Sequence, residues 1–302
     1  MTLTAILLLI VSAGTHAGWN LLSKRNNPNA ASFLIACIAG ILLLMPFVLV
    51  YREALGYFSL SSSLLVLIAG FFQATYYASL AGAYKTGHMS IAYPLARSSP
   101  AILVTVVSLF LGRSDQISRQ CMYGIILIVA GAFILPMRRF GDVRLQSYVN
   151  LSCLFALSAA FGTTGYSMID DEALRLLREA PNVSLQSWQI TPVYAFFEAA
   201  SSAFWLLFFV VGRKRERTML RQVMSKQFLS AVSMGFGIYL TYSLVLISMA
   251  FVTNVSYVVA FRQLSIPVGV ALGLWLLKEP VYIPKLVAVA VMFIGLILVG
   301  TG

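Results

Sequence analysis

The feature that most constrains this chain is a series of apolar segments, each about long enough to cross a lipid bilayer. An α-helix needs about 20 mostly apolar residues to do so. The sequence offers ten such segments, at residues 3–22, 31–51, 64–84, 89–111, 120–137, 148–169, 191–211, 228–250, 254–277 and 284–300. A helix pairs its own backbone polar groups, as lipid requires. We therefore predict an all-α integral membrane protein with ten transmembrane helices.

The composition supports the same fold class. Hydrophobic residues make up 60% of the chain, whereas soluble domains average about 45–50%. No basic stretch precedes Leu3, and His16, Trp19 and Asn20 stand where a signal peptide would have small residues. The first segment is therefore expected to be a retained helix. We expect a multi-pass protein of the cell membrane, with the bacterial inner membrane as its location.

The fourth and ninth segments carry the same arrangement of an arginine followed by a proline. Arg97 precedes Pro100, and Arg262 precedes Pro267, with the two arginines 165 residues apart (262 − 97). Charged residues this deep in a spanning segment are costly and rare. Their recurrence at one offset indicates that the second half of the chain repeats the first.

A second pair of segments supports the repeat. Residues 13–20 (AGTHAGWN) resemble residues 160–167 (AFGTTGYS), 147 positions later (160 − 13). The two offsets differ by 18 residues, about the length of an extra polar loop predicted at 170–190, for which a short surface helix is the alternative. Since each half has five segments, the second half would cross the membrane in the opposite direction, as in many secondary transporters. We predict two inverted five-helix repeats, residues 1–147 and 148–302.

The distribution of basic residues predicts an orientation. The net charge is +11. Loops on the side opposite the N-terminus hold 14 lysines and arginines, six of them within 213–227, and loops on the N-terminal side hold five. Basic residues gather in cytoplasmic loops, so both termini are predicted to lie outside the cytoplasm. The same rule accounts for the positive charge without nucleic-acid binding, which we do not expect.

Two short motifs and the five-plus-five organisation resemble the EamA family of the drug/metabolite transporter superfamily. The motifs are His16-Ala-Gly-Trp-Asn20 in the first segment and Leu277-Lys-Glu-Pro280 before the tenth. The Gly-Glu motif typical of the family is altered, with Gly112-Arg-Ser-Asp115 in the first half. The resemblance implies transport of small metabolites through a central cavity lined by segments 1, 3, 4, 6, 8 and 9. It also implies cytoplasmic termini, opposite to the charge distribution.

Arg97 and Arg262 are the strongest candidates for substrate binding. A guanidinium binds carboxylate or phosphate oxygens through two N–H groups and keeps its charge. Pro94 and Pro100 flank Arg97, so the fourth helix is predicted to bend there. The alternative is a structural role, in which each arginine binds helix-end carbonyl groups or pairs with Glu198.

Two titratable residues are candidates for proton coupling. Glu198 is the only carboxylate deep within a predicted segment, and it could instead neutralise an arginine. His16 lies two turns into the first helix, where an imidazole could titrate near neutral pH. A helix-packing role beside Gly14 and Gly18 is the alternative for His16.

Further substrate-binding candidates are polar or aromatic residues placed along the predicted cavity-lining helices. Mid-helix side chains of this kind can hydrogen-bond a ligand, although tyrosines near helix ends often anchor the interface instead. The residues are Trp19, Asn20, Gln73, Tyr77, Tyr93, Thr164, Tyr242 and Gln263, with Tyr76, Thr163, Tyr166 and Tyr239 in the same class.

No enzyme or ATPase motif is present in the sequence. It lacks Gly-x-Ser-x-Gly, His-Glu-x-x-His and the P-loop. With two histidines and three cysteines that form no Cys-x-x-Cys pair, no metal or other cofactor is expected.

The sequence thus favours a secondary transporter of a small anionic or zwitterionic metabolite: a carboxylate, an amino acid, or a phosphonate or phosphate. Alternatives are a broad drug/metabolite exporter or lipid-headgroup flippase, and a non-transporting membrane scaffold. The expected partners are the substrate, the bilayer and protons. Two halves can supply a complete site, so a monomer suffices and a homodimer is compatible with the sequence.

Overall fold

A computed structural model describes residues 1–23, 29–86, 89–141, 150–276, 278 and 280–302, with the side chains of 19–23, 84 and 89–95 left out. The described residues form helices and connecting turns, without a strand. The predicted all-α class is therefore confirmed. The boundary between the predicted repeats, at 147 and 148, and Leu277 and Glu279 of the second motif lie outside the described residues.

Five long helices form the first half of the chain, and they agree with the predicted segments to within a few residues. They are α1 (Leu3–Ser23), α2 (Ala30–Val50), α3 (Leu60–Thr86), α4 (Met89–Phe110) and α5 (Arg119–Ile134). Short 3₁₀ turns follow α2 and α4, at η1 (Arg52–Tyr57) and η2 (Ser114–Gln116).

The second half begins with α6 (Leu151–Arg178) and α7 (Ser187–Gly212), followed by α8 (Lys214–Gln222) and a π-helical turn, η4 (Val223–Gln227). It continues with α9 (Phe228–Ser248) and the 3₁₀ turn η5 (Met249–Phe251). The ninth segment is divided into α10 (Val255–Phe261) and α11 (Ser265–Leu276) by a 3₁₀ turn, η6 (Arg262–Leu264), and α12 (Ile283–Thr301) closes the chain.

Seven helical stretches in the described residues are long and apolar enough to cross a membrane. They are Ala30–Val50, Leu60–Ala83, Leu151–Arg178, Ser187–Gly212, Lys214–Phe251, Val255–Leu276 and Ile283–Thr301. Three shorter apolar stretches, Leu3–Gly18, Ala96–Phe110 and Arg119–Ile134, fall in the predicted first, fourth and fifth segments. The structure thus supports a multi-pass membrane protein, and ten crossings remain a prediction.

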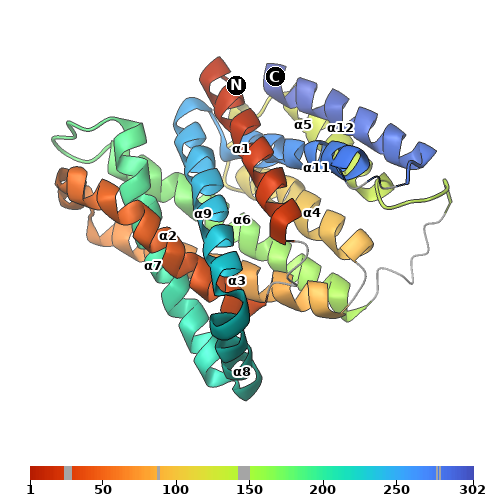
Figure 1. Cartoon of the computed structure of the whole chain (residues 1–302). Coiled ribbons are helices and arrows are strands. Elements are labelled where there is room, and N and C mark those ends of the chain that lie inside the picture. Colours follow the sequence, from red (N-terminus) through yellow and green to blue (C-terminus); the bar gives the residue numbers. More distant parts are fainter. Residues whose placement is uncertain (24–28, 87–88, 142–149, 277, 279) are drawn as a thin grey trace.

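The helices of the two halves pack in a reciprocal pattern (Figure 1). Helix α1 packs against α9, and α6 packs against α3. Likewise α2 contacts both α7 and α9, while α7 also contacts α3, and α5 pairs with α12. If α1, α2, α3 and α5 are exchanged for α6, α7, α9 and α12, this set of contacts is unchanged.

Glycines allow the closest of these crossings. A Cβ atom on Gly124 of α5 would lie 2.6 Å from the carbonyl oxygen of Gly295 in α12, and a Cβ on Gly295 would lie 2.6 Å from the oxygen of Gly124. Since the obstructing atoms are backbone, neither position accommodates a larger residue. Small residues at helix crossings are typical of membrane proteins, where close backbone packing holds helices together.

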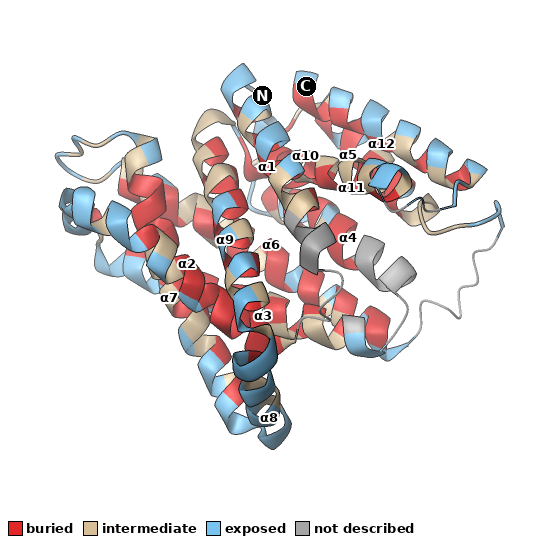
Figure 2. Cartoon of the chain, in the orientation of Figure 1, coloured by how far each residue is buried: buried red, intermediate tan, exposed pale blue. Residues whose placement is uncertain are grey.

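Burial is distributed as expected for a protein surrounded by lipid. Many large apolar side chains are exposed on the outside, including Phe110, Phe208 and Leu229, whereas Gln73 and Arg97 are buried (Figure 2). In water such a surface would promote aggregation. Against hydrocarbon chains it carries no penalty, so the interior is free to hold polar groups.

The segment at 170–190 corrects the prediction of a polar loop. Helix α6 continues past Ile169 to Arg178, and Asp170 has no exposed surface. The helix continues because Asp170, Ala173, Leu174 and Leu177 form a fully buried stripe at helical spacing. Glu198 is therefore not the only carboxylate deep in the protein.

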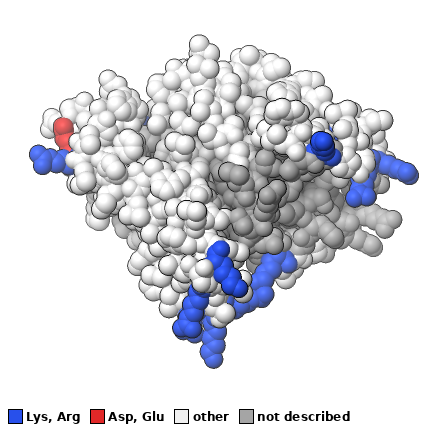
Figure 3. Space-filling model, in the orientation of Figure 1, with Lys and Arg blue, Asp and Glu red and all other residues white. Residues whose placement is uncertain are grey.

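The basic segment at 213–227 is also helical, where a loop was predicted. Helix α8 and the π-helical turn lead directly into α9. Basic side chains gather at this end of the molecule (Figure 3). Both chain termini lie together at another end, away from α8 (Figure 1).

Candidate functional site

A cavity of about 50 Å³ lies where helices of both halves meet. It is lined from the first half by Ser12, Ala13, His16, Phe33, Gln73, Tyr76, Tyr77 and Arg97, and from the second half by Tyr166, Ile238, Thr241, Tyr242, Val245 and Arg262. The lining helices are α1, α2, α3, α4, α6 and α9, together with the turn η6. Since a water molecule needs about 10–15 Å³ on this scale, the cavity as it stands holds a few waters.

Arg97 projects from α4 and is buried, with 8% of its surface exposed. Its Nη2 donates a hydrogen bond to Oγ of Ser265 at 2.7 Å, and that hydroxyl donates to the carbonyl oxygen of Arg262 at 3.0 Å. The Nε–H of Arg97 is buried without a partner in the described structure. Arg97 is thus tied to the interruption of the ninth segment and keeps a free donor.

Arg262 lies on the interruption itself. Its Nη2 donates to the hydroxyl of Tyr166 at 3.3 Å, and its Nη1 is buried without a partner among the described residues. Pro267 has no N–H to bond the carbonyl group of Gln263 four residues earlier, and the hydroxyl of Ser265 bonds the carbonyl oxygen of Arg262; together these favour the interruption. Helix α4, in contrast, is continuous past Arg97, so the interruption is found at the second arginine, not at the first.

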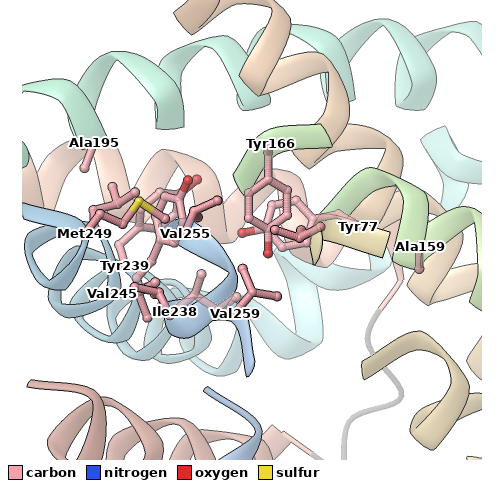
Figure 4. Packing of buried hydrophobic residues seen from close by; sticks show 14 of the residues in the cluster. Tyr77, Ala159, Tyr166, Ala195, Ile238, Tyr239, Val245, Met249, Val255 and Val259 are labelled. Carbon is pink, nitrogen blue, oxygen red and sulfur yellow. The ribbon is translucent and has the colours of Figure 1, made fainter. Parts of the chain in front are cut away.

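Aromatic side chains form much of the wall between the arginines. The ring of Tyr166 packs edge-on against Tyr76 and Tyr242, each at 6.0 Å between centroids. Tyr77 stacks on Phe33 at 4.7 Å. Figure 4 shows Tyr77 and Tyr166 in the same part of the core. These rings supply apolar walls and polar hydroxyl groups, the combination usual in binding sites for small molecules.

Gln73 adds an amide group to this wall. Its Nε2 donates to the hydroxyl of Tyr77 at 3.3 Å, while its Oε1 is buried without a partner among the described residues. The site therefore presents a free acceptor beside its two free donors, which suits a ligand that carries both an oxyanion and a donor group.

Asp170 accepts hydrogen bonds on both carboxyl oxygens immediately behind the cavity. Tyr194 of α7 donates to Oδ1 at 2.6 Å, and Tyr242 of α9 donates to Oδ2. Sequence reasoning missed Asp170 because it was assigned to a loop. The spacing of Ala173, Leu174 and Leu177 was the signal that could have placed it on a helix.

Glu198 lies on α7 and is not among the residues that line the cavity. Its Oε1 accepts a hydrogen bond from Ser202 at 2.8 Å, and its Oε2 is buried without a partner in the described structure. Among the described residues, ion pairs join Arg113 and Arg175 to acidic residues near the end of α6, and none involves Glu198. The alternative in which Glu198 neutralises an arginine thus has no support.

Residues 3–137 match the EamA-like transporter family. This first half of the chain belongs to the EamA-like transporter family. The family is part of the drug/metabolite transporter superfamily, so the expected membership is confirmed. No curated protein matches the sequence.

The fold of this EamA-like chain also matches a solved structure, described as "Crystal structure of protein". The match has a TM-score of 0.69 and 16% sequence identity, and it covers 99% of this chain and 96% of the other. At this identity the likeness shows the fold alone. Nearly the whole chain, and not only the family-matched half, shares that fold.

The cavity brings together six of the predicted site residues, from five different elements. They are His16, Gln73, Tyr77, Arg97, Tyr242 and Arg262. Thr164 and Gln263 are buried elsewhere and donate to backbone carbonyl groups of Ala160 and Val259. The side chains of Trp19, Asn20 and Tyr93 lie outside the described residues.

Two polar lining residues were not foreseen. Ser12 and Thr241 join α1 to α9, with Oγ of Ser12 donating to the carbonyl oxygen of Thr241 at 3.1 Å. Small hydroxyl residues on a transmembrane helix can bond within their own helix, so the sequence gives no signal for this role. No cluster of three or more metal-ligating side chains is found in the described part of the chain.

Proposed function

We propose that this EamA-like protein is a secondary transporter of a small organic anion or zwitterion, bound between Arg97 and Arg262. The substrate would be a carboxylate, an amino acid, or a phosphonate or phosphate. It would cross the membrane by alternating access through the central cavity. One chain suffices for this activity, because it supplies both arginines.

One observation carries the proposal. Arg97 comes from the first half and Arg262 from the second, yet both line one cavity, and each retains a buried N–H group without a partner in the described structure. Two positive charges in a region of low dielectric constant repel each other. Their remaining donors also lack the hydrogen bonds that buried groups normally make. An oxyanion between them relieves both costs.

The architecture favours alternating access. The reciprocal helix contacts support the two predicted inverted repeats, and interrupted helices at a repeat interface are typical of secondary transporters. The interruption at η6 places Arg262 at such a point. Because the cavity of about 50 Å³ is too small for a metabolite, binding requires the surrounding helices to separate.

Uptake into proteoliposomes tests this function. Lactate, glutamate and methylphosphonate represent the three substrate classes, and each is tested with and without a pH gradient. We expect saturable uptake of at least one, with Arg97→Ala and Arg262→Ala inactive and Arg217→Ala, a change on exposed α8, fully active. Uptake that persists in both cavity variants would contradict the proposed site.

A further inference from the structure

We infer that Asp170 is the proton-binding group of this transporter, and that a proton on Asp170 and an anion between the arginines promote each other's binding. The inference rests on the proposed function and adds the coupling ion and its site. It moves the coupling role from His16 and Glu198, which the sequence indicated, to a residue that the sequence placed in a loop.

The position of Asp170 carries the argument. Its carboxyl group is fully buried where α6, α7 and α9 meet. Tyr194 and Tyr242 donate one hydrogen bond to each oxygen. Tyr242 also lines the cavity. A single side chain thus separates the carboxyl group from the place where substrate is expected.

The charges around Asp170 come from several elements. Arg262 of η6 is the cation that acts on it, while Asp171 of α6 and Glu198 of α7 are the acidic groups nearby. The other elements packed on α6 contribute Tyr76 and Tyr77 from α3, Arg97 from α4 and Tyr257 from α10. Arg262 is therefore shared between the carboxyl group and the cavity.

The coupling follows from this sharing. In the empty site the positive charge of Arg262 stabilises a carboxylate at Asp170. An anion bound to Arg262 offsets that charge, so a proton binds Asp170 more readily. By thermodynamic reciprocity a proton on Asp170 strengthens anion binding by the same factor. A monovalent anion would then cross with one proton and without net charge.

Tyr242 provides a route for the proton. Its hydroxyl group can pass its own proton to Oδ2 of Asp170 and take one from a hydronium ion that reaches the cavity from bulk water. The hydronium ion becomes water, Asp170 gains one proton and Tyr242 is unchanged. The route explains how a fully buried carboxyl group can exchange protons with the cavity.

Proton uptake on anion binding tests the inference. Purified protein in weakly buffered detergent solution is mixed with lactate, glutamate or methylphosphonate, and a pH-indicator dye reports proton uptake while thermal stabilisation reports binding. We expect wild type to take up about one proton per bound anion. Its affinity for the anion should fall as the pH rises, by up to about tenfold per pH unit in the range where Asp170 loses its proton. Asp170→Asn should bind without proton uptake or pH dependence.

Matched variants make the outcome specific. Asp171→Asn, one position along α6, removes an acid whose side chain pairs with Arg113 at the protein surface, and it should retain proton uptake. Tyr242→Phe should slow proton uptake in stopped-flow measurements while Asp170 remains in place. This variant still tests the inference if the Asp170→Asn protein does not fold.

Two results would overturn the inference: anion binding to wild type without proton uptake, and persistent uptake in Asp170→Asn. Loss of uptake in His16→Gln or Glu198→Gln, with Asp170→Asn unaffected, would assign the role to that residue instead. If wild type binds none of the three anions, the proposed function itself is contradicted.

Discussion

Replacing Arg97 by alanine separates a binding role from a structural one, because its contacts are few. Among the described residues Arg97 makes one hydrogen bond, to Ser265 at 2.7 Å, and Ser265 keeps its own bond to the carbonyl oxygen of Arg262 without it. No carboxylate pairs with Arg97 in the described part of the chain. The substitution therefore leaves no buried charge unpaired.

The expected loss of affinity follows from the bond that the anion would form. A hydrogen bond to a charged group contributes about 1.5–3 kcal/mol, so Arg97→Ala should weaken anion binding by about 10- to 150-fold. Arg97→Lys keeps the charge but loses the planar fork, which should cost about 1–3 kcal/mol. The same reasoning applies to Arg262, whose single described bond is to Tyr166.

The empty protein should respond in the opposite sense. Removing one of two like charges from the interior lowers their repulsion, so Arg97→Ala should unfold at the same temperature as wild type or higher. Arg262→Ala should gain less stability, because it also removes the positive charge that acts on Asp170. Thermal unfolding in detergent, with and without the anion, measures both effects, and Arg217→Ala is the control. If both variants lose folded protein while the surviving fraction still binds the anion, the arginines are structural and the reasoning fails.

Three further predictions address packing, coupling and orientation. Gly295→Ala should destabilise the protein by about 1–3 kcal/mol because its Cβ would meet the backbone of Gly124, whereas Gly269→Ala, with no atom within 4 Å of the new Cβ, should be neutral in thermal unfolding. His16→Gln should leave the pH dependence of transport intact; a flattened profile would make His16 the coupling residue. A cysteine at exposed Ser225, in a cysteine-free background, should react with an impermeant reagent only after the membrane is permeabilised; labelling of intact cells would reverse the predicted orientation.

Much of the helical arrangement could be predicted because lipid imposes a length on each segment. The predicted starts of α4 and α9, at Met89 and Phe228, coincide with the observed ones. The interruption at Arg262 could not be placed. Both arginines precede a proline, and only the tertiary contact of Ser265 with Arg97 and with the Arg262 carbonyl group distinguishes the second site.

The cavity was only partly predictable, and the reason is again the lipid. A membrane helix can be apolar on every face, so its sequence does not tell which side faces the protein interior. Thr164 and Gln263 were as plausible as Gln73, and the rotation of their helices alone keeps their side chains out of the cavity lining. Asp170 was missed for a different reason: the charges of Asp171, Glu172 and Arg175, which lie on the other faces of the same helix, suggested a loop.

The central claim is that one anion lies between Arg97 and Arg262. It is tested most directly by crystals grown in the presence of 3-bromopropionate, a carboxylate whose bromine atom is located by anomalous scattering. We expect a peak in the central cavity, with the carboxylate within hydrogen-bonding distance of both guanidinium groups. Bromine peaks found only at the basic residues of α8, with the cavity unchanged, would contradict it.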